Sequence, residues 1–297
     1  MSCSDSRRQP VNRQKSFQNE DGPALYLVPT PIGNLQEVSP RMLDILTKAD
    51  VIACEDTRNS GILLKNLNIK KPLITHHEFN QEASIPGILN LLEEGRKVAV
   101  ISDAGYPLIS DPGNRLVRAV IEQDYPVISI SGPNAALDAL VASGLETSRY
   151  LFYGFLDAKS AKRKKQLASL KDLPFTLIFY EAPHRIEETL ADLLEVFGDR
   201  KMCLARELTK RYEEYLRGTV SEILPEAGLL KGEMVIVIEG AGKEDLQISM
   251  EKALEMMKER IDQGMKARAA AKKVSEISRI SRNELYTAWI ERSRNSE

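Results

Sequence analysis

Small and acidic residues follow the apolar segments of this chain, at points where a strand would end. The clearest case is Val98–Gly113, in which Val-Ala-Val-Ile is followed by Ser-Asp-Ala-Gly-Tyr-Pro. Glycine lets a ligand approach the backbone, and the carboxylate of Asp103 can hold hydroxyl groups or a cationic centre. In open α/β sheets, ligands bind in the crevice beyond the carboxyl ends of the strands. The pattern therefore predicts a small-molecule site here, without naming the molecule.

Comparable motifs flank most of the other apolar segments. They are Pro29–Asn34, Glu55–Arg58, Ser131–Ala135, Tyr180–Arg185, Arg206–Thr209 and Lys231–Met234. Two standard phosphate-binding motifs, GxGxxG after the first apolar segment and GxxxxGK[ST], do not occur in the sequence. The sequence therefore gives no support for NAD or ATP binding in the standard forms.

A first body of alternating strands and helices is predicted to carry most of these motifs. Its expected strands are 24–28, 51–54, 72–75, 97–101 and 126–130, and its expected helices lie near 39–48, 59–66, 84–94, 113–124 and 134–143. Strands separated by helical segments indicate βαβ units and a mostly parallel sheet. Ser39-Pro40 predicts a helix N-cap with proline at the first helical position, and Gly95 predicts a helix C-terminus.

A second body is predicted to begin near Ser148 and to contain a mixed sheet. Its expected strands are 150–154, 175–180, 201–205, 213–219 and 234–238, and its expected helices lie near 160–171, 184–197 and 220–230. Residues 248–293 are expected to form three short helices, an arrangement typical of a helix-turn-helix-like module. We therefore divide the chain into a disordered leader 1–22, an N-terminal lobe 23–147, a C-terminal lobe 148–245 and a helical module 246–297.

The composition is that of a soluble, non-polycationic chain. Its 297 residues have a net charge of -2 and are 42% hydrophobic. Cys3, Cys54 and Cys203 are far apart, which argues against a zinc ribbon or a redox pair and favours a reducing cytoplasm. His76 and His77 lack partners at metal-binding spacing, so no metal is expected. Neither a signal peptide nor an apolar run long enough to span a membrane is found.

In combination, these motifs resemble one family. The chain is similar to S-adenosylmethionine-dependent methyltransferases of the tetrapyrrole-methylase fold (class III), and among them to small-subunit (16S) ribosomal RNA cytidine 2'-O-methyltransferases. The resemblance spans residues 24–290. It rests on Val28-Pro-Thr-Pro-Ile-Gly-Asn-Leu35, Glu55-Asp-Thr-Arg58, Ser102–Gly113, Glu181-Ala-Pro-His-Arg185 and Ala205-Arg-Glu-Leu-Thr-Lys210. The chain departs from the family pattern at Glu146, where proline is common, at Tyr106, where threonine is usual, and at Leu156-Asp157-Ala158, where Leu-Pro-Arg is more typical.

The resemblance implies a two-lobed enzyme that binds S-adenosyl-L-methionine in the cleft between its lobes and pairs as a homodimer. The residues that it implies for cofactor binding are Pro31, Asp103, Ala104, Gly105, Tyr106, Ser131, Asn134, Ala135, Tyr180, Glu181 and Glu233. Transfer of a methyl group to a ribose 2'-oxygen is helped by a base within hydrogen-bond reach of the hydroxyl. Glu181, His184 and Glu55 are the candidate bases, and the sequence does not choose among them.

Ribosomal RNA or the ribosomal subunit is the expected partner. Basic residues of segment 159–165 and of the helical module would contact phosphates, together with cations near the cleft. The predicted RNA-binding residues are Arg58, Lys162, Arg163, Lys164, Lys165, Arg185, Lys272 and Lys273.

Plainer interpretations stay open. The basic run is also consistent with a solvated helix start, and Glu55, Asp56 and Arg58 with surface ion pairs. Asp103 could cap a turn and Asn134 a helix. The alternative functions are a corrin or precorrin methyltransferase of the same fold and a non-catalytic RNA-binding factor.

Overall fold

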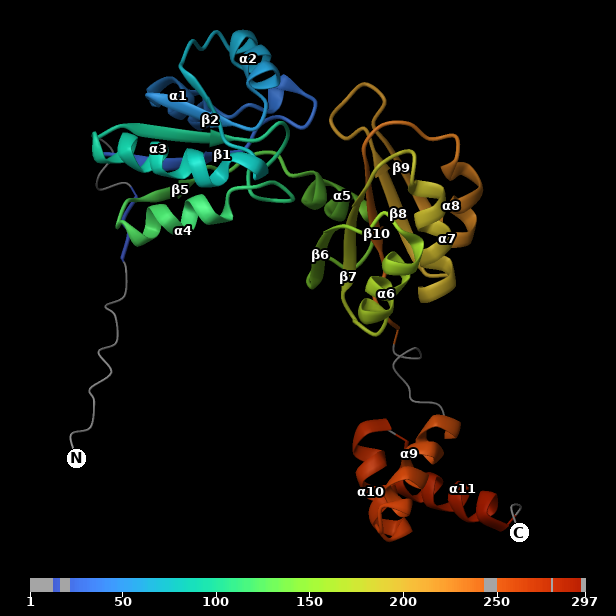
Figure 1. The fold of residues 1–297 in the computed structure, drawn as a ribbon. Coiled ribbons are helices and arrows are strands. Elements are labelled where there is room, and N and C mark those ends of the chain that lie inside the picture. Colours follow the sequence, from blue (N-terminus) through green and yellow to red (C-terminus); the bar gives the residue numbers. More distant parts are fainter. Residues whose placement is uncertain (1–12, 17–21, 243–249, 279, 295–297) are drawn as a thin grey trace, which may run out of the picture.

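Two α/β lobes and a group of three helices make up the protein (Figure 1). The computed structural model describes residues 13–16, 22–242, 250–278 and 280–294. Residues 1–12 and 17–21 of the predicted leader, and 246–249, 279 and 295–297 of the predicted helical module, lie outside the described residues. Within the described part, no helix is long and apolar enough to cross a membrane.

The first sheet is parallel throughout, as predicted, with the strand order β3-β2-β4-β1-β5. Its strands are β1 (Ala24–Val28), β2 (Val51–Cys54), β3 (Leu73–Thr75), β4 (Lys97–Ile101) and β5 (Val127–Ser129). The intervening helices are α1 (Pro40–Lys48), α2 (Thr57–Asn66), α3 (Gln81–Glu93) and α4 (Asn114–Glu122), with short 3-10 turns η1 (Leu35–Glu37) and η2 (Glu78–Asn80). The predicted signals are confirmed: the Ser39 side chain caps α1, and Gly95 has a positive φ of 83° after α3.

Both faces of this sheet are buried, because side chains of a strand alternate between the faces. In β1, Ala24, Tyr26 and Val28 pack with residues of α1 and α2. Leu25 packs on the other side with residues of α3 and α4. Figure 1 shows these two helix pairs on opposite faces of the sheet. A parallel sheet covered in this way leaves the strand ends and their loops as the places where a ligand can bind.

The second sheet is mixed, again as predicted, with the order β6-β7-β10-β8-β9. Its strands are β6 (Tyr150–Phe155), β7 (Thr176–Glu181), β8 (Lys201–Arg206), β9 (Glu214–Thr219) and β10 (Met234–Ile238). Strands β6 and β7 are parallel, whereas β10 lies between β7 and β8 and is antiparallel to both. Helices α6 (Ser160–Leu170), α7 (Ile186–Phe197) and α8 (Val220–Ala227) cover one face.

Helix α5 (Ala135–Ser143) covers the other face of the second sheet, although it follows the last strand of the first. Its side chains Ala136, Ala139 and Leu140 are buried against residues such as Ile178 and Val235. The change of lobe therefore falls between β5 and α5 and not at the predicted position 147. The physical reason is that the first sheet already has both faces covered, while the second has one face free.

The leader contacts the edge of the first sheet. The side-chain amide of Gln14 donates to the backbone oxygen of Val127 at 2.9 Å. In return, the backbone N–H of Val127 donates to Oε1 of Gln14 at 2.9 Å. Val127 belongs to β5, an edge strand, and such strands present unpaired backbone groups. The prediction of a disordered leader is therefore wrong for Gln14.

Three helices follow the second lobe and pack on one another (Figure 1). They are α9 (Met250–Asp262), α10 (Ala267–Ser278) and α11 (Arg282–Arg294). Met257, Val274 and Leu285 lie at the centre of their common core. Lys272 and Lys273 on α10 are exposed, so both remain available for the predicted RNA contact.

The basic run on α6 is largely balanced by acidic residues on α7. Arg163 is completely buried, and its Nε donates to Asp192 Oδ2 at 2.7 Å. Lys164 lies 2.6 Å from Glu195, whereas Lys165 is exposed. A buried guanidinium with a carboxylate partner cannot meet a phosphate, so the predicted RNA role of Arg163 is corrected to a structural one.

This pair gives a stability test. Replacing Arg163 with Ala removes the 2.7 Å cationic partner of the buried carboxylate of Asp192 and leaves it with Ser160 at 3.0 Å and Lys164 at 3.5 Å. The loss should cost about 3–5 kcal/mol of unfolding free energy. Lys165→Ala is the matched control, because the loss of an exposed cation on the same helix should change stability by less than about 0.5 kcal/mol. Urea denaturation of both variants checks this, and equal midpoints would show that the buried pair does not hold α6 to α7.

Candidate active site

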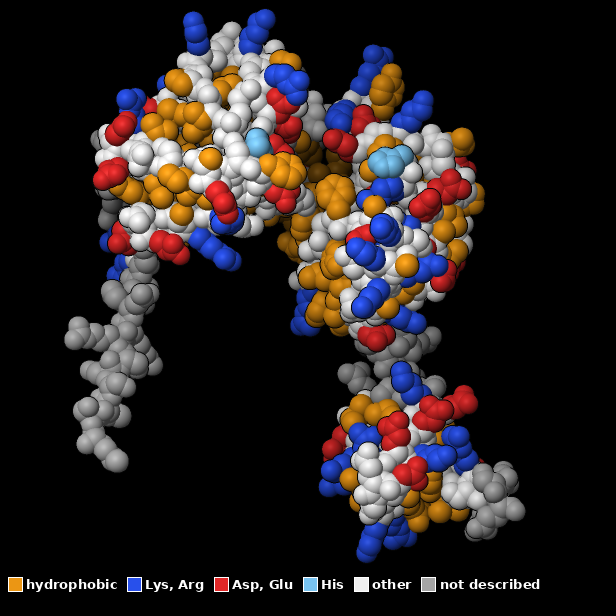
Figure 2. Space-filling view, viewed as in Figure 1, with side chains coloured by type: hydrophobic (Ala, Val, Ile, Leu, Met, Phe, Trp, Pro, Cys, Tyr) orange, Lys and Arg blue, Asp and Glu red, His pale blue; other side chains and the backbone are white. Residues whose placement is uncertain are grey.

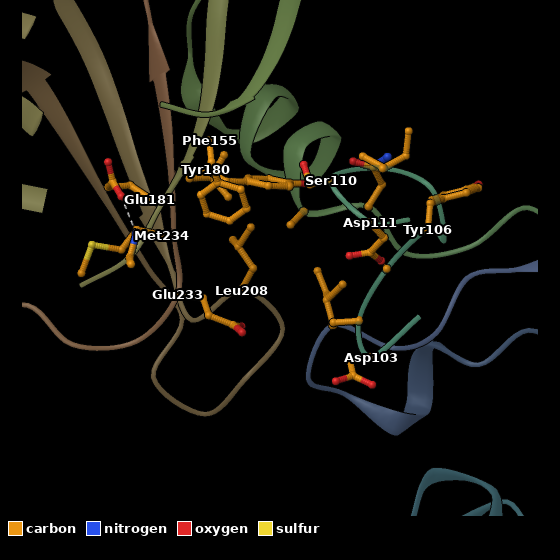
Figure 3. Close-up of a pocket in the computed structure, with 18 of the residues that line it drawn as sticks. Asp103, Tyr106, Ser110, Asp111, Phe155, Tyr180, Glu181, Leu208, Glu233 and Met234 are labelled. Atoms are coloured by element: carbon orange, nitrogen blue, oxygen red, sulfur yellow. Dashed lines mark hydrogen bonds between the residues drawn. The ribbon is translucent and has the colours of Figure 1, made fainter. Parts of the chain in front are cut away.

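A cavity of about 370 Å³ lies between the two lobes, at the carboxyl ends of the first sheet (Figure 3). Figure 2 shows the notch that separates the lobes, with acidic side chains bordering it on both sides. The cavity is lined by Ile32, Asp103, Ala104, Gly105, Tyr106, Ile109, Ser110, Asp111, Asn134, Ala135, Phe155, Tyr180, Glu181, Ala182, Pro183, Leu208, Glu233, Met234 and Val235. The loops after β4 and β5 therefore share one site with strands of the second lobe.

The loop after β4 is tied to the end of β1. Thr30 and Gly105 exchange two backbone hydrogen bonds, at 2.9 and 3.0 Å. The buried hydroxyl of Thr30 donates to the carbonyl of Ser102 at 3.0 Å, and the Ser102 hydroxyl donates to that of Gly105 at 2.8 Å. Gly105 has a φ of +71°, a conformation that side chains disfavour. Glycine is therefore needed for the turn that places Asp103 and Ala104 at the cavity.

Tyr106 joins this loop to the turn before α5. Its phenol oxygen accepts a hydrogen bond from the N–H of Gly132 at 3.0 Å. A Cβ on Gly132 would lie 2.5 Å from Cγ of Pro29, so only glycine permits the close approach to the end of β1. Tyr106, one of the residues that depart from the family pattern, thus has a structural role, because its side chain links the loop after β4 to the turn before α5.

The loop after β4 and the loop after β8 lie on opposite sides of the cavity, and both contain non-glycine residues at positive φ. Leu108 and Ser110 have φ values of 73° and 63° in the first lobe, and Glu207 and Thr209 have 49° and 64° in the second. Such conformations are costly for branched side chains and persist where the surrounding packing enforces them. The backbone that presents Asp111 and Leu208 to the cavity is therefore set by its surroundings.

Carboxylates line the cavity, and its described lining residues include no Lys, Arg or His. Asp103 accepts a hydrogen bond from Nδ2 of Asn59 at 3.0 Å. Glu233 lies 2.9 Å from the ammonium of Lys210. An acidic wall of this kind favours a positively charged ligand.

Asp111 is a lining residue that the sequence interpretation did not single out as a site residue. It is half-buried, and burial raises the pKa of its carboxyl to about 6, with further contributions from the charges of Glu55 and Asp103. Burial also raises the pKa of Tyr180, with the charges of Asp111 and Asp138 acting in the same direction. The available signal was the second Ser-Asp pair of the segment that precedes α4, in the same motif as Asp103.

Glu181 lines the cavity, but its carboxylate is occupied by other groups. The backbone N–H of Ala182 donates to Oε1 at 2.8 Å, and the hydroxyl of Thr189 donates to Oε2 at 2.6 Å. Nε of Arg185 lies 3.3 Å from Oε1. The candidate role of Glu181 as a base is therefore corrected, because its lone pairs already hold the turn between β7 and α7.

The two basic side chains of the same motif have different places. His184 is exposed and does not line the cavity, so it is not positioned as a base there. The guanidinium of Arg185 donates to the backbone oxygens of Leu156 and Asp157 at 2.8 and 3.2 Å. Its predicted RNA contact is corrected accordingly, because these bonds hold the segment after β6.

In the motif after β2, the plainer interpretation fits Asp56 and Arg58. Asp56 caps α2 by accepting from the N–H of Arg58 at 2.8 Å, and the two side chains form an ion pair at 2.8 Å. Arg58 and its hydrogen bonds lower the pKa of Asp56 to about 2. The side chain of Arg58 is 87% exposed, so its contact with RNA stays a prediction. Glu55 is exposed and lies outside the lining, although its charge reaches Asp111.

Most of the predicted cofactor residues come together in the cavity. Those that line it are Asp103, Ala104, Gly105, Tyr106, Asn134, Ala135, Tyr180, Glu181 and Glu233. Pro31 and Ser131 do not line it, although Ile32, which follows Pro31, does. Asn134 also caps α5, since its side chain accepts from the N–H of Leu137 at 3.1 Å. The apolar wall of Phe155, Leu208 and Met234 was missed, because such residues look like ordinary core in a sequence.

A family model described as Tetrapyrrole (Corrin/Porphyrin) Methylases matches residues 24–224, which span both lobes. Two proteins named Ribosomal RNA small subunit methyltransferase I are close in sequence. That of Bacillus subtilis (strain 168) is 41% identical over 287 residues, covering 94% of this chain and 98% of the relative. That of Halalkalibacterium halodurans is 40% identical over 286 residues, covering 94% and 99%.

Solved structures show the same fold at lower identity. Uroporphyrin-III-C-methyltransferase from Thermus thermophilus is 24% identical with a TM-score of 0.51, covering 72% of this chain and 93% of that one. The methyltransferase CobJ is 19% identical with a TM-score of 0.56, covering 74% and 95%. On the family match and on the sequence identity that extends over nearly the whole chain, the protein belongs to the tetrapyrrole methylase family, and within it to the ribosomal RNA small subunit methyltransferase I group.

Proposed function

We propose that the protein transfers a methyl group from S-adenosyl-L-methionine to the ribose 2'-oxygen of a cytidine in small-subunit (16S) ribosomal RNA. The observation that carries this proposal is the acidic cavity between the lobes of a chain that matches ribosomal RNA methyltransferases along 94% of its length. The family relationship supports the cofactor, and the acidic cavity supports its binding between the lobes.

The lining residues fit this cofactor. S-adenosyl-L-methionine carries a sulfonium and an ammonium group, and the carboxylates of Asp103 and Asp111 lie on one wall of the cavity (Figure 3). On the other wall, Phe155, Tyr180 and Leu208 offer aromatic and aliphatic surface suited to a flat base. The sulfonium makes the bound methyl group electrophilic, so the protein has to align the reacting atoms and exclude water.

Exposed cations beyond the cavity would hold the RNA. Lys162 has a side chain that is 68% exposed and only a long ion pair of 3.7 Å with Asp157. Lys165 is exposed on the same helix, and Lys272 and Lys273 are exposed on α10. Phosphate contacts of this kind position an RNA without reading its sequence. The 2'-hydroxyl distinguishes RNA from DNA, and a single-stranded loop gives access to it.

A corrin or precorrin substrate is less consistent with the chain. Uroporphyrin-III-C-methyltransferase and CobJ are 24% and 19% identical to it and cover 72% and 74% of it, so they share its fold alone. A non-catalytic RNA-binding factor would not need to keep a half-buried carboxyl in an open cavity.

We also propose a homodimer in the cytoplasm. Leu137 and Val141 lie one turn apart on α5 and are 41% and 73% exposed, which gives a second copy an apolar surface to cover. The charged surface on α6 and α10 is compatible with free diffusion to an RNA substrate.

The direct test follows tritiated methyl groups from S-adenosyl-L-methionine into 16S RNA, small ribosomal subunits and a precorrin. Label should enter RNA or the subunit, and the methylated nucleotide should resist alkaline cleavage, because the free 2'-hydroxyl that starts the cleavage is gone. Label in the precorrin alone, or label on a base with alkaline cleavage intact, would contradict the proposal.

Cofactor affinity tests the acidic wall. Asp103→Ala should weaken binding of S-adenosyl-L-methionine by about tenfold or more, because a hydrogen bond to a charged group contributes about 1.5–3 kcal/mol. Isothermal titration calorimetry measures it. Asp44→Ala is the control, since Asp44 forms an exposed pair with Lys48 on α1. Equal affinities in both folded variants would remove Asp103 from the cofactor site.

RNA affinity tests the exposed cations. The double variant Lys162→Ala/Lys165→Ala should flatten the dependence of log affinity on log salt concentration by about 0.7–0.9 for each phosphate that is no longer bound. Lys272→Ala/Lys273→Ala should behave likewise, and neither pair should alter cofactor affinity. Lys201→Ala is the control, because Lys201 lies at the end of β8 opposite to the cavity. An unchanged slope in a double variant would make that face a solvated surface only.

A further inference from the structure

The four lining carboxylates differ in what their oxygens already bind. Glu181 is held by Ala182 and Thr189, Asp103 accepts from Asn59, and Glu233 is paired with Lys210. Asp111 has no hydrogen-bond donor or cation on it within the described part of the chain, and only burial and neighbouring negative charges act on it. Among these four groups, it is therefore the one with no donor or cation on either oxygen in the described part of the chain.

Asp111 also lies on the cavity wall that belongs to the first lobe. Figure 3 shows it between Tyr106 and Asp103, on the wall opposite Leu208 and Glu233. Its loop runs from β4 to α4 and is packed on both sides of Asp111: Ser110 lies against Gly154 of the second lobe, and Gly113 lies against Leu108. A carboxylate on a loop held in this way keeps its position when ligands bind.

We propose that Asp111 is the base that takes the proton of the RNA hydroxyl during methyl transfer, an inference that rests on the proposed function. The ribose oxygen forms a bond to the methyl carbon, and the carbon–sulfur bond breaks with its electron pair going to sulfur. The hydroxyl proton passes to an oxygen of Asp111 and later to water. The sulfonium charge is neutralised in this step, and no oxidant or further reactant is required.

The surroundings of Asp111 suit this role. Glu55 and Asp103 face it with negative charge, the phenol of Tyr180 is close enough for its pKa to respond to Asp111, and no Lys, Arg or His is among the described lining residues. With its pKa raised to about 6, the carboxyl is ionised at pH 7–8 and is a stronger base than an ordinary aspartate. Glu55, the other candidate base that remains, acts on Asp111 through its charge.

Kinetics with Asp111→Asn test the proposal, with Asp44→Asn as the control. Since a general base contributes about 10²–10⁴-fold, kcat should fall by that factor, while the affinity for RNA stays the same and the affinity for S-adenosyl-L-methionine falls by a much smaller factor than kcat. The wild-type protein and Asp44→Asn should lose activity as the pH falls through about 6, and the low residual activity of Asp111→Asn should lack this acid limb.

A second measurement needs no activity. The folded-state pKa of about 6 exceeds the value of about 3.9 for an unfolded chain, so the contribution of Asp111 to wild-type stability is lost as the pH rises from about 4 through about 6. Asp111→Asn should therefore melt at a higher temperature than the wild type at pH 8, with the difference closing towards pH 4. A difference that is constant with pH would overturn the environment assigned to Asp111.

The remaining outcomes separate the two proposals. Wild-type kcat and an intact acid limb in Asp111→Asn would exclude Asp111 as the base, and a loss of cofactor affinity in proportion to kcat would make it a cofactor ligand instead. If the wild-type protein binds the cofactor but methylates neither RNA nor subunit, the proposed function itself fails, and the role of Asp111 towards an RNA hydroxyl falls with it.

Discussion

The packing of α5 on the second sheet is the contact on which the geometry of the site depends. Ala136, Ala139 and Leu140 are buried against that sheet, only a few residues after β5 ends the first sheet. The connection between β5 and α5 is short, so the carboxyl ends of the strands of the first sheet lie close to the second sheet. The cavity lies where the two lobes, each with its own buried core, are joined by this helix.

Loops at the cavity are then held by short backbone links and not by burial of large side chains. Thr30 bridges to Gly105, and Tyr106 receives the N–H of Gly132. Leu108 and Thr209 in the loops on the two sides of the cavity have positive φ values of 73° and 64°. A site made of pinned loops on two rigid lobes is preorganised for aligning two reactants, which is what methyl transfer from a sulfonium requires.

Charge has two separate uses in the molecule. Arg163 and Arg185 serve the fold, the first in a buried pair with Asp192 and the second on the backbone oxygens after β6. The acidic wall serves the site, where burial, together with the charges of Glu55 and Asp103, raises the pKa of Asp111. Lysines such as Lys165 and Lys272 are left for solvent or for phosphates. The formal charge of a segment therefore says little until the partner of each group is known.

The sequence by itself determined the local structure and the family. Alternating apolar segments, N-cap residues and glycines are local signals, so the strands, the helices, the parallel first sheet and the mixed second sheet could all be predicted, as could the loop 103–106 and the turn 134–135 at the cavity. Tertiary structure alone decided which charged groups are free. The partner of Arg163 is Asp192, 29 positions away, and one partner of Glu181 is Thr189, 8 positions away. Arg185 is bound to backbone oxygens that lie 28 and 29 positions away. Asp111 differs from these residues in having no such partner among the described residues. Burial and partnership are properties of distant segments brought together, and no local pattern encodes them.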